Sequence, residues 1–406
     1  MDLINVKEAL EIVLTHSQNF GIEEVDFLNA SGRVLRERIF ADRDFPPFDR
    51  VSMDGIAISS EAFNNGQRTF KIEGIQAAGS PQLTLQNSKN CIEAMTGAVL
   101  PKNTDAVIQY ELLTIENGTA NVNLEAVKSF QNIHLKGTDK KQGDLLINEN
   151  TLISPAEIGI FATVGKTTVK VAKQPKVMVV STGNELVEVG EIPADHQIRR
   201  SNVFTLVSLL EKLQIKAETL HVLDDKKVLL TKIDSLFNNY DVLIFSGAVS
   251  KGKFDFIPEV LDQLGVKKLF HEVKQRPGKP FWFGKKVYTE RSRSEKTIFA
   301  FPGNPVSTFV NCLKYFYPWQ YKSVGLNFEN KQQAILSEDF YFKPELTYFL
   351  QVKLNQVEGK LMATPISGKG SGDLANLADA DAFLELPDNR SNFIKGEVFP
   401  VIIYRQ

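Results

Sequence analysis

The stretch DVLIFSGAVSKGKFD, residues 241–255, decides the fold of this chain of 406 residues. Its apolar run at 242–245 predicts a buried parallel strand, and the small residues that follow predict a turn at the strand's carboxyl end. Ligands of open α/β sheets bind at that end. Small residues there let backbone N–H groups approach an anion closely. Asp255 would place a carboxylate beside this anion site, where a metal ion can also bind.

Two further strand-end turns have the same character. VMVVSTGNEL (177–186) and TIFAFPGNPVS (297–307) are short β-rich runs that end in glycine with polar neighbours, and the stiff, basic RPGKP (276–280) lies between them. Any one of these could be only a tight turn. Together they predict a parallel sheet whose loops offer backbone amides, a lysine (Lys279) and carboxylates. That combination suits a phosphate or oxyanion with a divalent cation.

Composition excludes several classes of function. The chain is 43% hydrophobic and 24% charged, which is ordinary for a globular protein. Its net charge of −2 gives no strong field for nucleic acid or an anionic membrane. Two cysteines outside any CxxC pair and five scattered histidines argue against a disulfide framework and a zinc site. The charged N-terminus predicts an amphipathic helix, and no long apolar run appears, so we expect a cytoplasmic protein without a membrane partner.

The pattern of elements predicts four parts. Residues 174–323 alternate strand and helix, as in a doubly wound α/β sheet domain. Residues 46–139 hold short β-like pieces between turns and predict an inserted β-rich domain. Residues 1–45 and 140–173 would join into one elongated α/β linker domain, and the alternating pattern of 324–406 predicts a small C-terminal β-barrel.

Seven motifs occur in one order along nearly the whole chain: PPFDRVSMDGIA (46–57), MTGA (95–98), STGNEL (181–186), SGAVSKG (246–252), PGKP (277–280), PGNPVS (302–307) and GSGDL (370–374). In these motifs the chain resembles the MoeA family of molybdopterin molybdenumtransferases, which is related to the E domain of gephyrin. The resemblance implies the same four-part layout, with a MogA-like, molybdopterin-binding sheet domain at 174–323, and an elongated homodimer.

The resemblance also implies a transferase reaction of molybdenum cofactor biosynthesis. Adenylylated molybdopterin meets molybdate, the phosphoanhydride is cleaved, AMP leaves and molybdenum enters the dithiolene. Such a site must hold nucleotide phosphates, a divalent cation such as Mg²⁺ and a second oxyanion. The chain shows no evident Ser–His or Cys–His nucleophile, so positioning and electrostatics are the more economical mechanism.

Each requirement has candidate residues. The magnesium ligands would be carboxylates at the sheet's end, namely Glu185, Asp224 and Asp255. Molybdate would be held by Arg276, Lys279 and Ser307, since an oxyanion needs positive charge and donors. The remaining substrate-binding positions are Gly247, Ala248, Ser250 and Gly252 for the phosphates, together with Pro302, Gly303, Asn304 and Ser371.

A second cluster comes from the β-rich part. Asp54 lies in MDG and Thr96 in MTGA. By themselves they could be a turn aspartate and a capping threonine. By resemblance both would face the sheet domain of the other subunit, so the active site would be composite. The expected catalytic set is then Asp54, Thr96, Glu185, Asp224 and Asp255.

The chain departs from the family pattern at six positions. They are Ala248 in place of a glycine, Lys253 in place of an acidic residue, His134 in place of an arginine, Arg200 in place of an aspartate, Gln351 in place of an arginine and Asn376 in place of a serine. Lys253 could replace a lost positive charge at the oxyanion site. Weakened molybdate binding or an altered substrate are the other interpretations.

Two other functions stay open at this stage. One is a molybdopterin adenylyltransferase-like enzyme, whose sheet domain resembles this one but which would need ATP and no further domains. The other is a non-catalytic, gephyrin-like scaffold that binds partner proteins. Other molybdenum cofactor biosynthesis proteins are further candidate partners. The sequence does not distinguish molybdate from tungstate.

Overall fold

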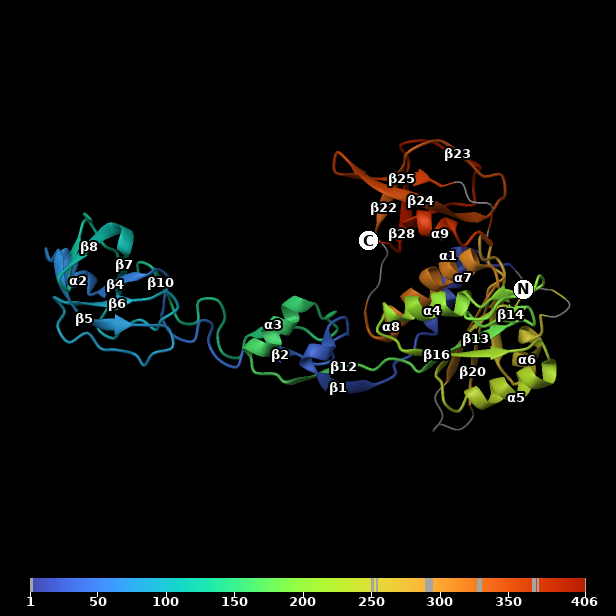
Figure 1. Cartoon of the computed structure of the whole chain (residues 1–406), viewed down its shortest axis with the longest axis horizontal. Helices are drawn as coiled ribbons and strands as arrows, with labels where there is room; N and C mark the ends of the chain where they lie inside the picture. The colour runs from blue at the N-terminus through green and yellow to red at the C-terminus, as the bar shows by residue number, and fades with distance from the viewer. Residues whose placement is uncertain are drawn as a thin grey trace.

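The computed structural model describes residues 3–249, 252, 255–288, 295–326, 331–366, 370 and 372–405. Its parts lie in a row, with a β-rich domain at one end, a narrow middle part, and the sheet domain with the barrel beside it at the other end (Figure 1). This mixed α/β architecture confirms the predicted fold class of a doubly wound sheet domain with a β-rich insertion, an elongated part and a C-terminal barrel.

The sheet domain is built on six strands in the order β16, β13, β17, β21, β20, β18. β13 pairs in parallel with β16 and β17, and β21 pairs in parallel with β17, whereas β20 is antiparallel to both of its neighbours. From β13 the chain goes first to one side and then to the other, so the strand order reverses at β13. The strands are β13 (Val177–Thr182), β16 (Ala217–Val222), β17 (Val242–Ser246), β18 (Lys267–His271), β20 (Trp282–Lys286) and β21 (Lys296–Phe301).

Helices cover both faces of this sheet. α1, α4, α7, the π-helical turn η3 and α8 share a core with one face, and α5 and α6 share a core with the other. All residues of β13 and β17 are buried, which explains their continuous apolar runs. The helices are α1 (Val6–Thr15), α4 (Asn202–Glu211), α5 (Lys226–Leu236), α6 (Ile257–Gln263), α7 (Pro305–Asn311), η3 (Cys312–Phe316) and α8 (Tyr317–Ser323).

The N-terminal helix lies elsewhere than the sequence predicted. The sequence pattern predicts residues 1–45 as part of the elongated domain, but α1 packs on the sheet domain through Val6, Ala9 and Val13. Asn5 caps this helix by accepting a hydrogen bond from the backbone N–H of Glu8, at 2.8 Å. The apolar face of a short amphipathic helix does not specify which neighbouring core it covers, which is why the sequence pattern alone misplaced it.

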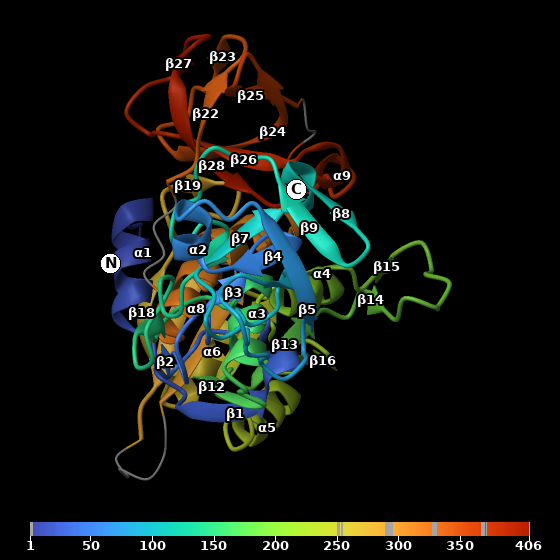
Figure 2. The ribbon, with the colours of Figure 1, turned by 90° about the vertical axis from the view of Figure 1, so that its left-hand side faces the viewer.

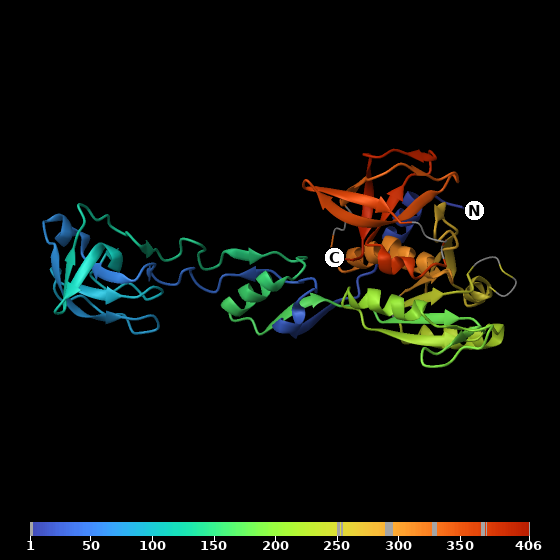
Figure 3. The same cartoon turned by 45° about the horizontal axis from the view of Figure 1, so that its top comes forward.

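The middle part is made by two chain segments that share one core. β1 (Ile22–Asp26) pairs with β12 (Thr168–Ala172), and β2 (Ile39–Phe40) pairs with β11 (Leu145–Ile147). The helix α3 (Pro155–Thr163) and the 3₁₀ turn η1 (Phe27–Ala30) complete it. In Figure 3 the segments that lead to and from the β-rich domain run side by side, and a bridge joins Phe45 to Lys140.

The β-rich domain has six strands in the order β7, β4, β6, β5, β9, β8. Two further short strands, β3 and β10, pair with each other where the domain meets the middle part. The elements are β3 (Arg50–Val51), β4 (Gly55–Ile58), α2 (Ser60–Asn64), β5 (Thr69–Gln76), β6 (Cys91–Ala94), β7 (Ala106–Gln109), η2 (Tyr110–Leu112), β8 (Leu113–Glu116), β9 (Thr119–Val122) and β10 (Ile133–His134).

The C-terminal part closes into a five-stranded barrel, because β24 pairs with both β25 and β26 while β22 and β28 complete the ring. β19 of the sheet domain adds to the barrel by pairing in parallel with β24. The elements are β19 (Gln275–Arg276), β22 (Gln333–Leu336), β23 (Phe340–Tyr341), β24 (Thr347–Val357), β25 (Lys360–Pro365), α9 (Asn376–Asp379), β26 (Ala382–Leu386), β27 (Asn392–Phe393) and β28 (Val398–Ile403).

Two features complete the description. A loop that carries the short parallel strand pair of β14 (Leu186–Val187) and β15 (Ile198–Arg199) projects from the sheet domain, as Figure 2 shows. Within the described parts of the chain, no helix combines the length and the apolar character needed to cross a bilayer.

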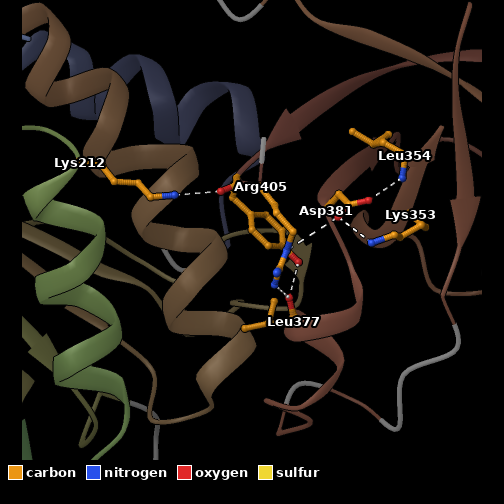
Figure 4. Close-up of polar contacts among 7 residues, drawn as sticks. Lys212, Lys353, Leu354, Leu377, Asp381 and Arg405 are labelled. Atoms are coloured by element: carbon orange, nitrogen blue, oxygen red, sulfur yellow. Dashed lines mark hydrogen bonds and ion pairs between the residues drawn. The ribbon is translucent and has the colours of Figure 1, made fainter. Parts of the chain in front are cut away.

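A polar network joins the barrel to the sheet domain (Figure 4). The Nζ atom of Lys212, the C-cap of α4, donates to the backbone oxygen of Tyr404 at 3.0 Å, and Arg405 donates to the backbone oxygen of Leu377 at 3.2 Å. Asp381 accepts hydrogen bonds from Lys353 Nζ and from the backbone N–H of Leu354, each at 3.0 Å. Burial opposes ionisation of Asp381, but these donors outweigh it and lower the pKa of the carboxyl.

We expect Asp381→Asn to lower the free energy of opening of the barrel by about 1.5–3 kcal/mol at neutral pH, because charge-assisted hydrogen bonds are lost. Since the pKa is lowered in the folded state, this contribution is present above the unfolded value of about 3.9 and is lost as the pH falls through the folded value. Hydrogen exchange of the barrel amides at pH 7 measures the effect. Asp379→Asn, on the exposed face of α9, is the control. Equal protection in both variants would contradict the role of Asp381.

Candidate active site

A cleft lies at the carboxyl ends of β13 and β17, where the strand order reverses. It is a cavity of about 490 Å³ lined by the loop after β13, the first turn of α4, the loop after β17 and the loop after β21. In open α/β sheets, ligands bind at such a switch point, outside the carboxyl ends of the strands. Of the predicted substrate-binding residues, Gly247, Ala248, Gly303 and Asn304 line this cleft.

The loops around the cleft are held together by close contacts. Gly247 has φ of 110°, and a Cβ atom there would lie 3.0 Å from the backbone oxygen of Thr182, so a side chain would separate the two loops. Asn202 joins the start of α4 to the end of β17 and to the loop after β21, because its Nδ2 donates to Ser246 Oγ at 3.0 Å and to the backbone oxygen of Gly303 at 2.7 Å. The floor of the cleft is therefore preorganised.

Ala248 has φ of 51°, which lies in the left-handed region. The resemblance described above implies a glycine at this position. A non-glycine residue in this region costs on the order of 1 kcal/mol. The chain keeps the loop conformation at Ala248 in spite of the substitution.

Three carboxylates line the same cleft, those of Glu185, Asp224 and Asp255. Burial raises the pKa of Asp224, and the charges of Glu185 and Asp255 raise it further, while a hydrogen bond from its own N–H to Asn184 fixes the local backbone. Its Oδ1 is buried and has no hydrogen-bond partner among the described residues. The cleft thus holds negative charge that a cation would neutralise.

The three carboxylates do not form a ready coordination sphere. Over the described ranges, no group of three or more His, Cys, Asp or Glu side chains is placed to hold a metal ion. Asp255 instead folds back on its own loop, where its Oδ2 accepts the backbone N–H of Gly252 at 2.8 Å. The oxygen donors and the orphaned Asp224 atom fit a hard cation, but at least one of the side chains would have to turn.

A second pocket of about 580 Å³ adjoins the cleft and shares Glu185, Gly303 and Asn304 with it. It is lined by Arg276, Lys279, Pro302 and Ser307 as well. The structure therefore brings together the residues that we predicted for the oxyanion. It places them next to the residues predicted for the phosphates.

Buried polar side chains fix the loop that carries Lys279. Gln275 Nε2 donates to the backbone oxygen of Pro277 at 2.9 Å and to Asn311 Oδ1 at 2.8 Å, while Tyr315 donates to Gln275 Oε1. Gly278 has φ of 92°, and a Cβ there would lie 2.5 Å from Asn311 Oδ1. The cationic loop is thus rigid and tolerates only glycine at this position.

The second predicted cluster also forms. Asp54 Oδ1 accepts the backbone N–H of Thr96 at 2.6 Å, and this hydrogen bond lowers the pKa of Asp54. Both residues are exposed. They lie in the β-rich domain, at the opposite end of the chain from the sheet domain (Figure 1). Within one chain they do not meet the cleft.

Other predicted positions contribute less. Gly252 holds Asp255 rather than lining the cleft. Ser250, Ser371 and Lys253 lie outside the described residues. His134 contacts Asp139 and Arg50 in the β-rich domain. In the barrel, Gln351 and Asn376 each have one buried side-chain atom without a hydrogen-bond partner among the described residues.

Sequence reasoning missed some of the residues that shape the site. It also found no Ser–His pair, whereas Ser181 Oγ lies 3.2 Å from His221 Nδ1. His221 Nδ1 also lies 3.3 Å from the backbone oxygen of Ser181, and the Ser181 hydroxyl accepts a hydrogen bond from Arg200. Both groups therefore already have structural hydrogen-bond partners and do not form a free nucleophile–base pair. Asn202, Gln275 and Asn311 carry no motif of their own; their only signal is polarity within segments that are otherwise apolar.

Fold and site define the class of protein: a multidomain α/β protein with an amide-lined cleft at a switch point and a cationic pocket beside it. Three family models match the chain. They are described as the MoeA N-terminal region (domain I and II) at residues 4–165, a probable molybdopterin binding domain at 178–319 and the MoeA C-terminal region (domain IV) at 333–404.

Known relatives agree with these matches. The chain is 41% identical to a molybdopterin molybdenumtransferase of Synechocystis sp., over 98% of this chain and 99% of the relative. It is 30% identical to that of Staphylococcus epidermidis, over 98% and 95%. A crystal structure of the molybdopterin biosynthesis MoeA protein of Pyrococcus horikoshii OT3 superposes with a TM-score of 0.83 at 27% identity, covering 99% of this chain and 100% of that one. The chain belongs to the MoeA family.

Proposed function

We propose that this chain is a transferase of molybdenum cofactor biosynthesis that inserts molybdenum from molybdate into adenylylated molybdopterin and releases AMP. The observation that carries the proposal is the pair of adjoining pockets that share Glu185, Gly303 and Asn304. One offers amides and carboxylates, as a phosphoanhydride with a cation needs. The other offers Arg276 and Lys279, as a small oxyanion needs. Full-length relatives named molybdopterin molybdenumtransferase support the same reaction.

The chain's own residues would act by positioning. The amides of Gly247 and Ala248 face the phosphates, and Lys279 with Ser307 orients molybdate beside them. Glu185, Asp224 and Asp255 would hold Mg²⁺. When bound, this cation would polarise the phosphoanhydride and offset its charge. No covalent intermediate with the protein is required.

We expect Asp255→Asn to slow AMP release from adenylylated molybdopterin at least about tenfold, which corresponds to some 1.4 kcal/mol of barrier. The reason is the loss of one carboxylate from the cation site. The assay supplies Mg²⁺ and molybdate and follows AMP, with Asp262→Asn on the exposed face of α6 as the control. Unchanged turnover at saturating Mg²⁺ would refute the assignment of Asp255.

If the wild-type protein instead releases pyrophosphate from ATP and molybdopterin, it is an adenylyltransferase, and a protein inactive in both assays would be a scaffold.

The active site is proposed to be shared between two subunits of a cytoplasmic homodimer. The support is the distance along the molecule that separates the Asp54–Thr96 pair from the cleft (Figure 1). The Asp54 carboxylate is exposed, accepts the backbone N–H of Thr96 and lies in the β-rich domain, away from the cleft of its own chain. A second chain would bring this domain to the cleft.

Mixing two inactive variants tests this arrangement. We expect Asp54→Ala chains and Asp255→Ala chains to recover part of the activity when their subunits exchange, because some heterodimers then contain one intact site. AMP release is measured before and after exchange, and each variant mixed with itself is the control. No recovery in demonstrated heterodimers would mean that both residues act within one chain.

Lys279→Ala should raise the molybdate concentration for half-maximal rate by about ten- to hundredfold, since a charge-assisted contact to an oxyanion contributes roughly 1.5–3 kcal/mol. Nucleotide affinity should change little. Lys268→Ala, exposed on β18, is the matched control. Lys253→Ala should give a smaller shift if this lysine compensates for the arginine missing at Gln351. A normal molybdate response of Lys279→Ala would remove this residue from the oxyanion site.

A further inference from the structure

Arg200 is a buried cation in the wall of the cleft. The residue is 6% exposed and lines the cavity. Its Nε donates to Ser181 Oγ at 3.1 Å, and its Nη1 donates to Glu188. Its Nη2 is buried and has no hydrogen-bond partner among the described residues. The guanidinium is therefore only partly satisfied.

This arrangement is costly unless a ligand completes it. A guanidinium stays charged at all relevant pH values, and a buried donor without a partner costs about 1–3 kcal/mol. Its ion-pair partner compensates poorly, because the side chain of Glu188 is 55% exposed and its charge is screened by solvent. An anion in the cleft would give Nη2 a partner and bring a second negative charge to the guanidinium.

The first turn of α4 points to the same ligand. Ser201, Asn202 and Val203 line the cleft, and Ser201 caps this ten-residue helix without a side-chain hydrogen bond. The side chain of Asn202 is already used on Ser246 and Gly303, and the first turn carries no acidic residue. The backbone N–H groups at the helix start are thus left to an incoming group. A helix N-terminus of this kind favours phosphate.

Charge balance in the cleft supports an anion at this end. Glu185, Asp224 and Asp255 would repel a phosphate that enters the cleft. Arg200 supplies positive charge on the same wall, next to Ser201.

We propose that Arg200 and the first turn of α4 form a phosphate subsite of the cleft, which binds the phosphate of the nucleotide half of the substrate. The identity of the ligand as a nucleotide rests on the proposed function. The subsite itself rests on the unpartnered guanidinium atom and the uncapped helix start.

Binding of AMP and of adenosine to the full chain tests the proposal, because the two ligands differ only in the phosphate. By calorimetry, we expect Arg200→Gln to raise the Kd of AMP about ten- to hundredfold and to leave adenosine unchanged. Arg200→Lys should recover part of the loss. Inorganic phosphate should compete with AMP in the wild type and not in Arg200→Gln. Arg43→Gln, exposed in the middle part, is the charge-matched control.

Glu188→Gln distinguishes a binding role from a structural one. If Arg200 serves phosphate, removing its competing carboxylate should tighten AMP about two- to fivefold, the value of an exposed ion pair. If Arg200 only braces the parallel β14–β15 strand pair against Ser181, Glu188→Gln should weaken both ligands or neither.

Equal effects of Arg200→Gln on AMP and adenosine, or no effect on AMP, would overturn the subsite and leave the proposed function standing. Failure of the AMP-release assay, together with AMP binding that depends on Arg200, would overturn the function and leave the subsite standing. A wild-type chain that binds no AMP would overturn the subsite, and the AMP-release assay alone would decide the function.

Discussion

The parallel pairing of β13 with β17 is the constraint on which the rest of the structure depends. Residues Val177–Ser181 pair in register with Val242–Ser246, so both strands end at the same level. Because the chain leaves β13 toward one edge of the sheet and β17 toward the other, the two loops diverge and leave a cleft between them. Gly247, packed against the backbone of Thr182, keeps the loops close without filling that cleft.

Opposite charges divide the site into regions. Burial and then the neighbouring carboxylates raise the pKa of Asp224, while Lys279 lies in the adjoining pocket on a loop fixed by Gln275 and Asn311. Glu185 lines both spaces. Neighbouring groups of opposite sign, each held by rigid backbone, can orient two anionic reactants and a cation without a nucleophile from the protein. The elongated middle part then sets how far Asp54 and Thr96 stand from this arrangement (Figure 1).

Much of the fold could be predicted from local pattern. The continuous apolar runs of β13, β17 and β21 indicated strands covered on both faces, and the alternation around β24 indicated the barrel. The grouping of site residues followed from one rule, because loops after parallel strands meet at one edge. The position of α1 was missed, since its apolar face could have packed on more than one core. Asn202, Gln275 and Asn311 were missed because a hydrogen-bond partner that is distant along the chain leaves no periodic signal.

The sequence by itself determined the class of fold, the family and the residue types at the strand ends, because these depend on hydrophobic periodicity and on short motifs. Only the tertiary structure decided that Glu185 lines both pockets and that Asp255 turns onto Gly252. It also decided that Arg200 is buried with one nitrogen that has no hydrogen-bond partner in the described part of the chain. Those facts depend on burial and on contacts between segments far apart along the chain. The charge state of a carboxyl and the hydrogen-bond partners of a guanidinium are set only when those segments pack together.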